Sequence, residues 1–140
     1  MRRQDKFPDT ATFHFYNANP HNRYTTDCVI RAICTALEQS WEQTLKELAE
    51  LAVKKGVMVD DVACYGEYLR RKGWAKRQQP RKMDNTKYTG RDFCKSSICD
   101  GNKRYIAHIG GHHIVAIVEK RVWDIWNSTD GCIGNYWVKL

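Results

Sequence analysis

The sequence lacks any long apolar run. A membrane-spanning helix needs roughly 18 or more consecutive apolar residues, and no stretch of the chain approaches that length. The N-terminal segment, MRRQDKFPDTATFHFY, carries polar and acidic side chains where a signal peptide needs an apolar segment of at least about seven residues. We therefore expect a cytoplasmic protein with no membrane partner.

The six cysteines include no C-x-x-C pair, a spacing typical of zinc and redox sites. The nearest alternative is a C-x4-C pair followed by an H-x3-H pair, formed by Cys94, Cys99, His108 and His112. This spacing is compatible with tetrahedral zinc, but a Gly-Gly pair interrupts the two histidines, which would normally share a helix. We therefore expect no metal and no other cofactor, and free thiols in a reducing cytosol.

Acidic residues are missing from the segment between positions 70 and 82, although the whole chain has a net charge of +7. Its basic residues are Arg70, Arg71, Lys72, Lys76, Arg77, Arg81 and Lys82. Such a run is most often a solvated surface. The alternative is a contact surface for a host protein or for nucleic acid, where neutralising phosphates gives affinity without sequence specificity.

The length of 140 residues and an aromatic content of 11% predict one domain with one core, over residues 1–140. Hydrophobic periodicity predicts a short strand over residues 12–16, helices over 28–38, from 40 onward and from 60 or 61 to 72, and a helical turn near 89–94. Runs at 105–109, 114–118, 122–126 and 136–138 are typical of strands. The expected class is α+β, with N-terminal helices followed by an antiparallel β-meander.

Cys28 opens the first long helix, in the segment TTDCVIRAICTAL. At 100° per residue, Cys28 lies off the apolar stripe, beside Arg31, whereas Cys34 lies within it. Cys34 is therefore expected in the core. Backbone N–H groups at a helix N-terminus favour a thiolate, so Cys28 is a candidate nucleophile if a base lies nearby.

The candidate base is a histidine at the head of a predicted hairpin, GGHHIVAIVEKRVWDIWNS. A three-residue turn at positions 119–121 would set His113 opposite Asn127, whose amide oxygen could orient the imidazole. A two-residue turn would instead set His112 beside Asn127. Asp124 is the second choice for the orienting group, because it should point to the opposite face from Asn127.

This order of Cys28, a strand beginning with His113, and an Asn or Asp on the next strand resembles the papain-like cysteine peptidases. HIVAIV resembles the family's histidine strand, and Asn127 with Ser128 resembles its Asn-Ser pair. The family's oxyanion glutamine lies six residues before the nucleophile, where this chain has Asn22, and Val29 replaces the tryptophan that follows the cysteine.

A closer resemblance is to small, single-domain papain-like proteins of bacteria and their phages, most of them uncharacterised. It rests on Thr26-Asp27-Cys28, on Arg31 and on the strand Asp124-Ile125-Trp126-Asn127, and it extends from FHFYNANP to GNYW. It implies a papain-like fold and a Cys-His-Asn/Asp triad. The Cys28 backbone N–H, with Asn22, would bind the oxyanion.

The leading functional hypothesis is a cysteine-dependent amide hydrolase, of peptidase or isopeptidase type, that acts on a protein or peptide through a thioester. A deamidase or transamidase would use the same residues. The alternative is a non-catalytic phage or mobile-element protein that binds a host protein or nucleic acid through its basic segment.

Overall fold

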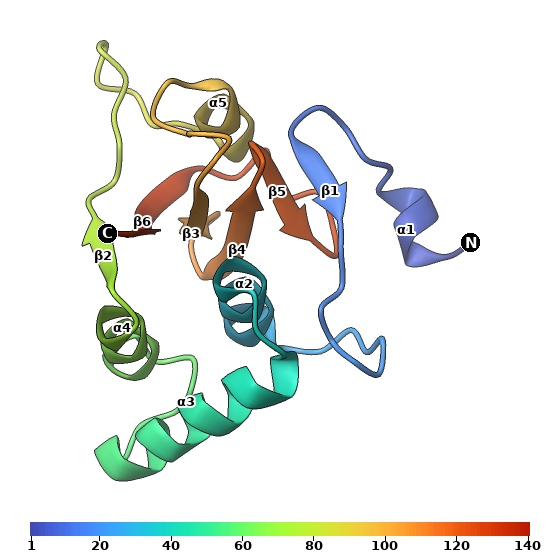
Figure 1. Ribbon diagram of the computed structural model, residues 1–140. Helices are drawn as coiled ribbons and strands as arrows, with labels where there is room; N and C mark the ends of the chain where they lie inside the picture. The colour runs from blue at the N-terminus through green and yellow to red at the C-terminus, as the bar shows by residue number, and fades with distance from the viewer.

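A six-stranded mixed sheet forms the centre of the protein in the computed structural model, which describes residues 1–140 (Figure 1). The strands are β1 (Phe13–Phe15), β2 (Trp74–Arg77), β3 (Arg104–Ile109), β4 (His113–Val118), β5 (Arg121–Asp124) and β6 (Ile133–Lys139). Their spatial order is β1-β5-β4-β3-β6-β2. The two central strands, β4 and β3, are buried along almost their whole length, so β4 is held at the centre of the sheet.

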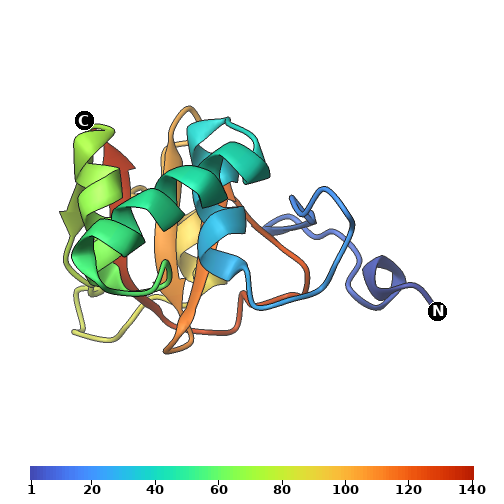
Figure 2. The same ribbon diagram turned by 90° about the horizontal axis from the view of Figure 1, so that it is seen from below.

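Helices cover both faces of this sheet unequally. α2 (Cys28–Leu37), α3 (Trp41–Lys55) and α4 (Val62–Arg71) pack on one face, and α5 (Gly90–Lys95) packs on the other (Figure 2). A further short helix, α1 (Arg3–Lys6), lies at the N-terminus. None of these helices combines the length and the apolar character that crossing a membrane requires. Helices packed on a mostly antiparallel sheet make the protein an α+β domain.

Two of the predicted helix starts are confirmed together with their caps. Ser40 Oγ accepts a hydrogen bond from the Gln43 backbone N–H at 3.0 Å at the start of α3. Thr89 Oγ1 accepts one from the Asp92 N–H at 3.1 Å at the start of α5. These side chains satisfy backbone donors that the first helical turn leaves free. α4 begins after Asp61 and ends at Arg71, slightly earlier than predicted.

The sheet differs from a simple meander in three places. β1 pairs in parallel with β5 at one edge, and β2, which was not predicted, pairs antiparallel with β6 at the other. β6 returns to pair with β3, on the side away from β4. Only β3, β4 and β5 follow one another as a meander. The edge strands β1 and β2 are short, and packing rather than local sequence holds them in place.

The turn between β4 and β5 has two residues, so the predicted three-residue turn is wrong. Val118 pairs with Arg121, and the turn residues Glu119 and Lys120 have φ values of 52° and 62°. Left-handed conformations at both central positions define the tight hairpin turn whose twist matches the strands. The whole β4–β5 register therefore moves by one residue from the expected one.

Candidate functional site

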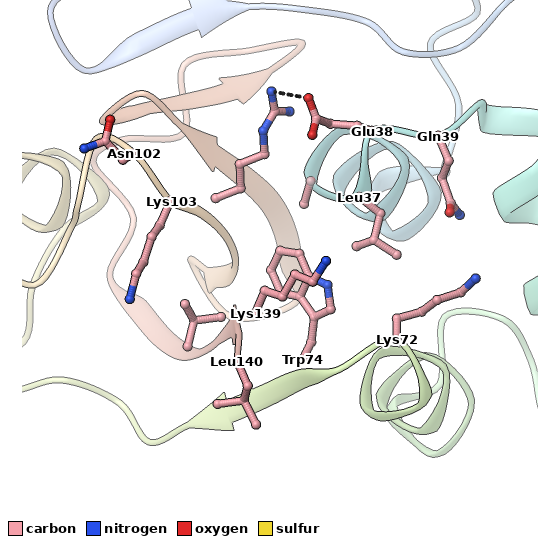
Figure 3. A pocket seen from close by; sticks show the side chains of 12 residues that line it. Leu37, Glu38, Gln39, Lys72, Trp74, Asn102, Lys103, Lys139 and Leu140 are labelled. Atoms are coloured by element: carbon pink, nitrogen blue, oxygen red, sulfur yellow. Dashed lines mark ion pairs between the residues drawn. The ribbon is translucent and has the colours of Figure 1, made fainter.

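A large hollow in the surface lies away from the predicted site residues. It encloses about 610 Å³ between the C-terminal end of α2 and the strands β2, β3 and β6 (Figure 3). An ion pair between Arg104 and Glu38, at 3.1 Å, lies on its rim. Its lining contains neither cysteine nor histidine. None of the predicted catalytic residues therefore lines this hollow.

A second hollow, of about 510 Å³, contains Cys28 at the N-terminus of α2. The cleft lining combines this thiol with polar and aromatic groups from α4, β2, β3 and the start of β4. The lining residues are Thr26, Cys28, Asp60, Val62, Tyr65, Lys76, His108, His112, Ile114 and Asn135. We call this hollow the Cys28 cleft. It gives the half-buried Cys28 thiol access to solvent.

Cys28 and His113 lie together where the start of α2 meets the start of β4, and they influence each other's protonation. Burial raises the pKa of the Cys28 thiol, but hydrogen bonds from His113 and from the Ile114 backbone, with the charges of His113 and Arg31, outweigh it, so the pKa is lowered. Burial lowers the pKa of His113, but Asp124 and Cys28 raise it to about 9. Opposite shifts of this kind favour a thiolate beside an imidazolium.

The orienting partner of His113 is Asp124. His113 Nε2 lies 2.6 Å from Asp124 Oδ2, which leaves the other ring nitrogen for the Cys28 thiol. The Asp124 side chain is fully buried. It also accepts hydrogen bonds from Ser128 Oγ and from the Ile125 N–H, both at 2.8 Å. Burial raises the pKa of Asp124, but His113, the Ile125 N–H and Arg31 together lower it, so the carboxylate stays ionised.

The expected pairing of His113 with Asn127 is wrong. When the register set by the two-residue turn is continued past the end of β5, His113 lies opposite Trp126. The centroids of their rings are 5.2 Å apart. Asp124 is two residues before Trp126 and therefore on the same face, next to His113. The Asn127 amide oxygen instead accepts from the Thr129 backbone N–H at 3.1 Å. The opposite orientations of Asp124 and Asn127 follow from their three-residue separation; the wrong turn length is what placed Asn127, rather than Asp124, on the face of His113.

The other predicted candidates lie near the cleft or outside it. His112 is exposed in the β3–β4 turn and lines the Cys28 cleft. Asn22 lies outside the cleft, exposed in the loop before α2, where its amide oxygen accepts from Asn17 Nδ2 at 3.4 Å. The Cys and His residues of the zinc alternative are not brought together: Cys94 and Cys99 belong to the core under α5, whereas His108 is in the Cys28 cleft on the other face of the sheet.

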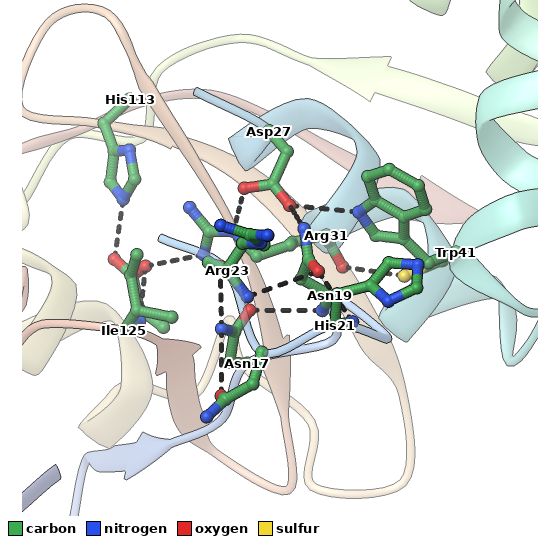
Figure 4. Close-up of polar contacts among 12 residues, drawn as sticks. Asn17, Asn19, His21, Arg23, Asp27, Arg31, Trp41, His113 and Ile125 are labelled. Atoms are coloured by element: carbon green, nitrogen blue, oxygen red, sulfur yellow. Dashed lines mark hydrogen bonds and ion pairs between the residues drawn. The ribbon is translucent and has the colours of Figure 1, made fainter. Parts of the chain in front are cut away.

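A buried network of charged and polar side chains binds Asp124 at Oδ1, the oxygen that His113 does not contact. Arg31 donates to Asp124 Oδ1 at 3.1 Å and to Asp27 Oδ1 at 2.8 Å. Asp27 also accepts from Trp41 Nε1 at 3.0 Å and from Asn19 Nδ2 at 3.2 Å (Figure 4). Asp27 thus stands at the N-cap position of α2, but its carboxylate binds these groups rather than capping the helix. The network joins α2, α3 and β5 around the site.

The role of this network at the site was not predicted, but the sequence contains one signal for it. Asp27 and Arg31 are four residues apart, the spacing of side-chain ion pairs on a helix, and Arg31 is on the Cys28 side of α2. Both side chains are buried, at 5% and 8% exposure. α2 is therefore enclosed on its Cys28 side as well as along its apolar stripe, and Cys34 lies in the core as predicted.

The basic segment is partly neutralised within the protein. Ion pairs join Arg71 to Glu67 at 2.8 Å, Lys72 to Glu47 at 3.5 Å and Lys82 to Asp92 at 2.7 Å. The remaining basic residues of the segment, without such ion pairs, are Arg70, Lys76, Arg77 and Arg81. Three of the seven charges are thus already balanced by neighbouring carboxylates.

In comparisons with known proteins, no family model, no curated protein and no solved structure matches this chain, so a proposal for its function has to rest on the site itself.

Proposed function

We propose that the protein is a cysteine-dependent amide hydrolase of papain-like fold, with Cys28 as nucleophile, His113 as general base and acid, and Asp124 as the orienting carboxylate. The observation that carries the proposal is the 2.6 Å contact between His113 Nε2 and the buried Asp124, on a histidine that also interacts with Cys28. A nucleophile, a base and an orienting group in this order constitute the general arrangement of covalent acyl transfer.

The reaction follows from these three groups. The Cys28 sulfur adds to an amide carbonyl carbon, and the carbonyl electrons move to oxygen to give a tetrahedral oxyanion. When this intermediate collapses, the C–N bond breaks and the His113 imidazolium gives its proton to the departing nitrogen. His113 then takes a proton from water, which attacks the thioester and releases a carboxylic acid. Asp124 stabilises the imidazolium throughout.

The substrate class is a protein or peptide amide, and the departing nitrogen distinguishes the variants of this function. A peptidase or isopeptidase releases an amine, whereas a glutamine deamidase releases ammonia. A transamidase passes the acyl group to a second amine instead of water. All three need the same activated thiol, so thiol activation is the first property to measure.

Selective alkylation tests that activation. Iodoacetamide at neutral pH is expected to label half-buried Cys28 faster than exposed Cys132, with both sites quantified by peptide mass spectrometry. The Cys28→Ala variant should lose the fast phase and keep the slow one. Equal rates at Cys28 and Cys132 would contradict the proposal, because exposure alone should favour Cys132.

A non-catalytic binding role is the second candidate, and the exposed charges around β2 favour it. Lys76 and Arg77 are exposed on this edge strand, near Arg70 at the end of α4. Such a surface suits an acidic host protein or a phosphate backbone. Binding to DNA or RNA that falls steeply with salt would support nucleic acid, whereas no retention at low salt excludes it.

A further inference from the structure

The Tyr65 hydroxyl is a buried polar group beside Cys28 that the proposed triad does not use. Tyr65 comes from α4, is 2% exposed and lines the Cys28 cleft together with the thiol. Its hydroxyl contacts His108 Nε2, on β3, at 3.2 Å. A buried hydroxyl normally has a partner, and here the only partner is a second cleft residue. The pair therefore fixes a phenol oxygen at the wall of the cleft.

The electrostatics of the cleft keep both members of this pair neutral. Burial raises the pKa of Tyr65 to about 12, and the charge of Cys28 adds to the effect, so the phenol stays protonated in the cleft that it shares with the thiol. Burial, with the charges of Lys76 and His112, lowers the pKa of His108. Donation by the phenol O–H into the cleft requires the His108 tautomer that carries its proton on Nε2, because that imidazole donates to the phenol oxygen. The phenol O–H then remains free to donate into the cleft.

We propose that Tyr65 is the side-chain oxyanion donor of this site and that His108 is the residue that positions it. The inference rests on the proposed acyl-transfer function. When the Cys28 sulfur bonds to a carbonyl carbon, the carbonyl electron pair moves to oxygen, and the Tyr65 O–H donates a hydrogen bond to that oxygen without transferring its proton. The electron pair forms the carbonyl double bond again when the leaving group departs. The Cys28 backbone N–H, at the start of α2, is the second donor.

This assignment replaces Asn22 in the oxyanion site. The amide oxygen of Asn22 accepts from Asn17, and the residue lies in the exposed loop outside the cleft. Tyr65, in contrast, shares the cleft with the nucleophile and contacts the same apolar core. The phenol is held on a helix and a central strand, and a preorganised donor stabilises the transition state without reorganisation.

Reaction with two different electrophiles distinguishes the oxyanion role of Tyr65 from activation of the Cys28 thiol. Iodoacetamide reacts by displacement of iodide at a saturated carbon, so no oxyanion forms. p-Nitrophenyl acetate reacts through a tetrahedral oxyanion, and nitrophenolate then leaves. In Tyr65→Phe, acylation of Cys28 by the ester is expected to fall roughly 100-fold, as for other single oxyanion donors, while alkylation stays within about twofold of the unmodified chain, since the same thiolate reacts.

Tyr68→Phe is the matched control, because Tyr68 lies one turn further along α4 and its hydroxyl bonds to Glu47 and Gln39 outside the cleft. Both rates should stay unchanged in that variant. For the positioning role, His108→Gln keeps an N–H donor and should retain the ratio of acylation to alkylation, whereas His108→Leu should lower it.

The outcomes distinguish the two proposals. Acylation of Tyr65→Phe at the unmodified rate, with fast alkylation of Cys28, would overturn the oxyanion assignment and leave the hydrolase proposal standing. Equal falls in both rates would also overturn it, because they indicate a structural role. Slow alkylation and no acylation of Cys28 in the unmodified chain would overturn the hydrolase proposal, and this inference with it.

Discussion

Arg31 joins the nucleophile helix to the carboxylate that orients the histidine. Its guanidinium, one turn after Cys28, lies 3.1 Å from Asp124 Oδ1 and 2.8 Å from Asp27 Oδ1. With His113 protonated and Cys28 ionised, charges of opposite sign alternate from Asp27 through Arg31, Asp124 and His113 to the sulfur. Each buried charge therefore has an opposite neighbour, which is the condition under which buried ions are tolerated.

Removing the Arg31 charge is expected to destabilise the fold. Arg31→Met keeps most of the side-chain volume but leaves buried Asp27 without a cation and buried Asp124 with His113 alone, which should lower the free energy of unfolding by about 3–5 kcal/mol. Arg71→Met is the matched control, because that side chain is 65% exposed in its pair with Glu67 and should cost less than about 1 kcal/mol. Urea denaturation of both variants measures the difference, and similar losses would contradict this reading of the network.

The Cys28 thiolate is expected to form below the ordinary thiol range. Hydrogen bonding and charge from His113 and Arg31 outweigh burial and lower the pKa of Cys28, so thiolate absorbance near 240 nm should rise with a midpoint below that of an ordinary thiol. In His113→Ala, burial is no longer offset by the imidazole, and the midpoint should move upward. Subtracting the same titration of Cys28→Ser isolates this one thiol. An unchanged midpoint in His113→Ala would contradict this prediction, because it would mean that the imidazole does not influence the pKa of the Cys28 thiol.

The identity of the orienting residue can be tested by titrating His113. Its pKa is raised to about 9 chiefly by Asp124, against the effect of burial. Asp124→Asn removes the negative charge, so the pKa should fall towards or below the ordinary value near 6.5, as followed by NMR of the ring carbons. Asn127→Ala is the control and should leave the titration of His113 unchanged, because Asn127 bonds to Thr129. The reverse pattern would restore Asn127 as the orienter.

The same two variants should differ in the pH dependence of alkylation. The raised pKa of His113 keeps the imidazolium charged up to about pH 9, and this charge holds the Cys28 thiolate at lower pH. In Asp124→Asn the imidazolium loses its proton at lower pH, so the thiolate loses its partner and alkylation at neutral pH should slow. Asn127→Ala should follow the unmodified profile. Identical profiles for Asp124→Asn and the unmodified chain would exclude this coupling.

Local signals were enough to predict the helix starts that have side-chain caps and the buried face of α2. Ser40 and Thr89 identified helix starts because a side-chain cap is a local interaction, and periodicity placed Cys34 in the core. β1 and β2 were harder to predict as parts of the sheet, because each is short and is fixed by a partner distant in sequence. Pairing between distant segments leaves little trace in either segment alone.

The residue that orients His113 could not be derived from the sequence, because its identity depends on the length of the β4–β5 turn. Asn-Gly or Asp-Gly would have indicated a two-residue hairpin turn, whereas this chain has Glu119 and Lys120, which adopt left-handed conformations without that signature. One residue of register decides which of Asp124 and Asn127 faces His113. The candidate triad was thus predictable in two of its three members, and the third required the hairpin geometry.

Replacing this turn should stabilise the hairpin without altering the site. Non-glycine residues in the left-handed region cost roughly 1–2 kcal/mol, and Glu119 and Lys120 both occupy it. The double substitution Glu119→Asn and Lys120→Gly provides the residues that favour this turn, although it removes the contact of Lys120 Nζ with the Ser96 carbonyl at 3.3 Å. We expect the free energy of unfolding to rise by about 1 kcal/mol and the alkylation rate of Cys28 to stay unchanged. A loss of stability, or a change in the His113 titration, would mean that these two residues do not form the tight turn on which the pairing of His113 with Asp124 depends.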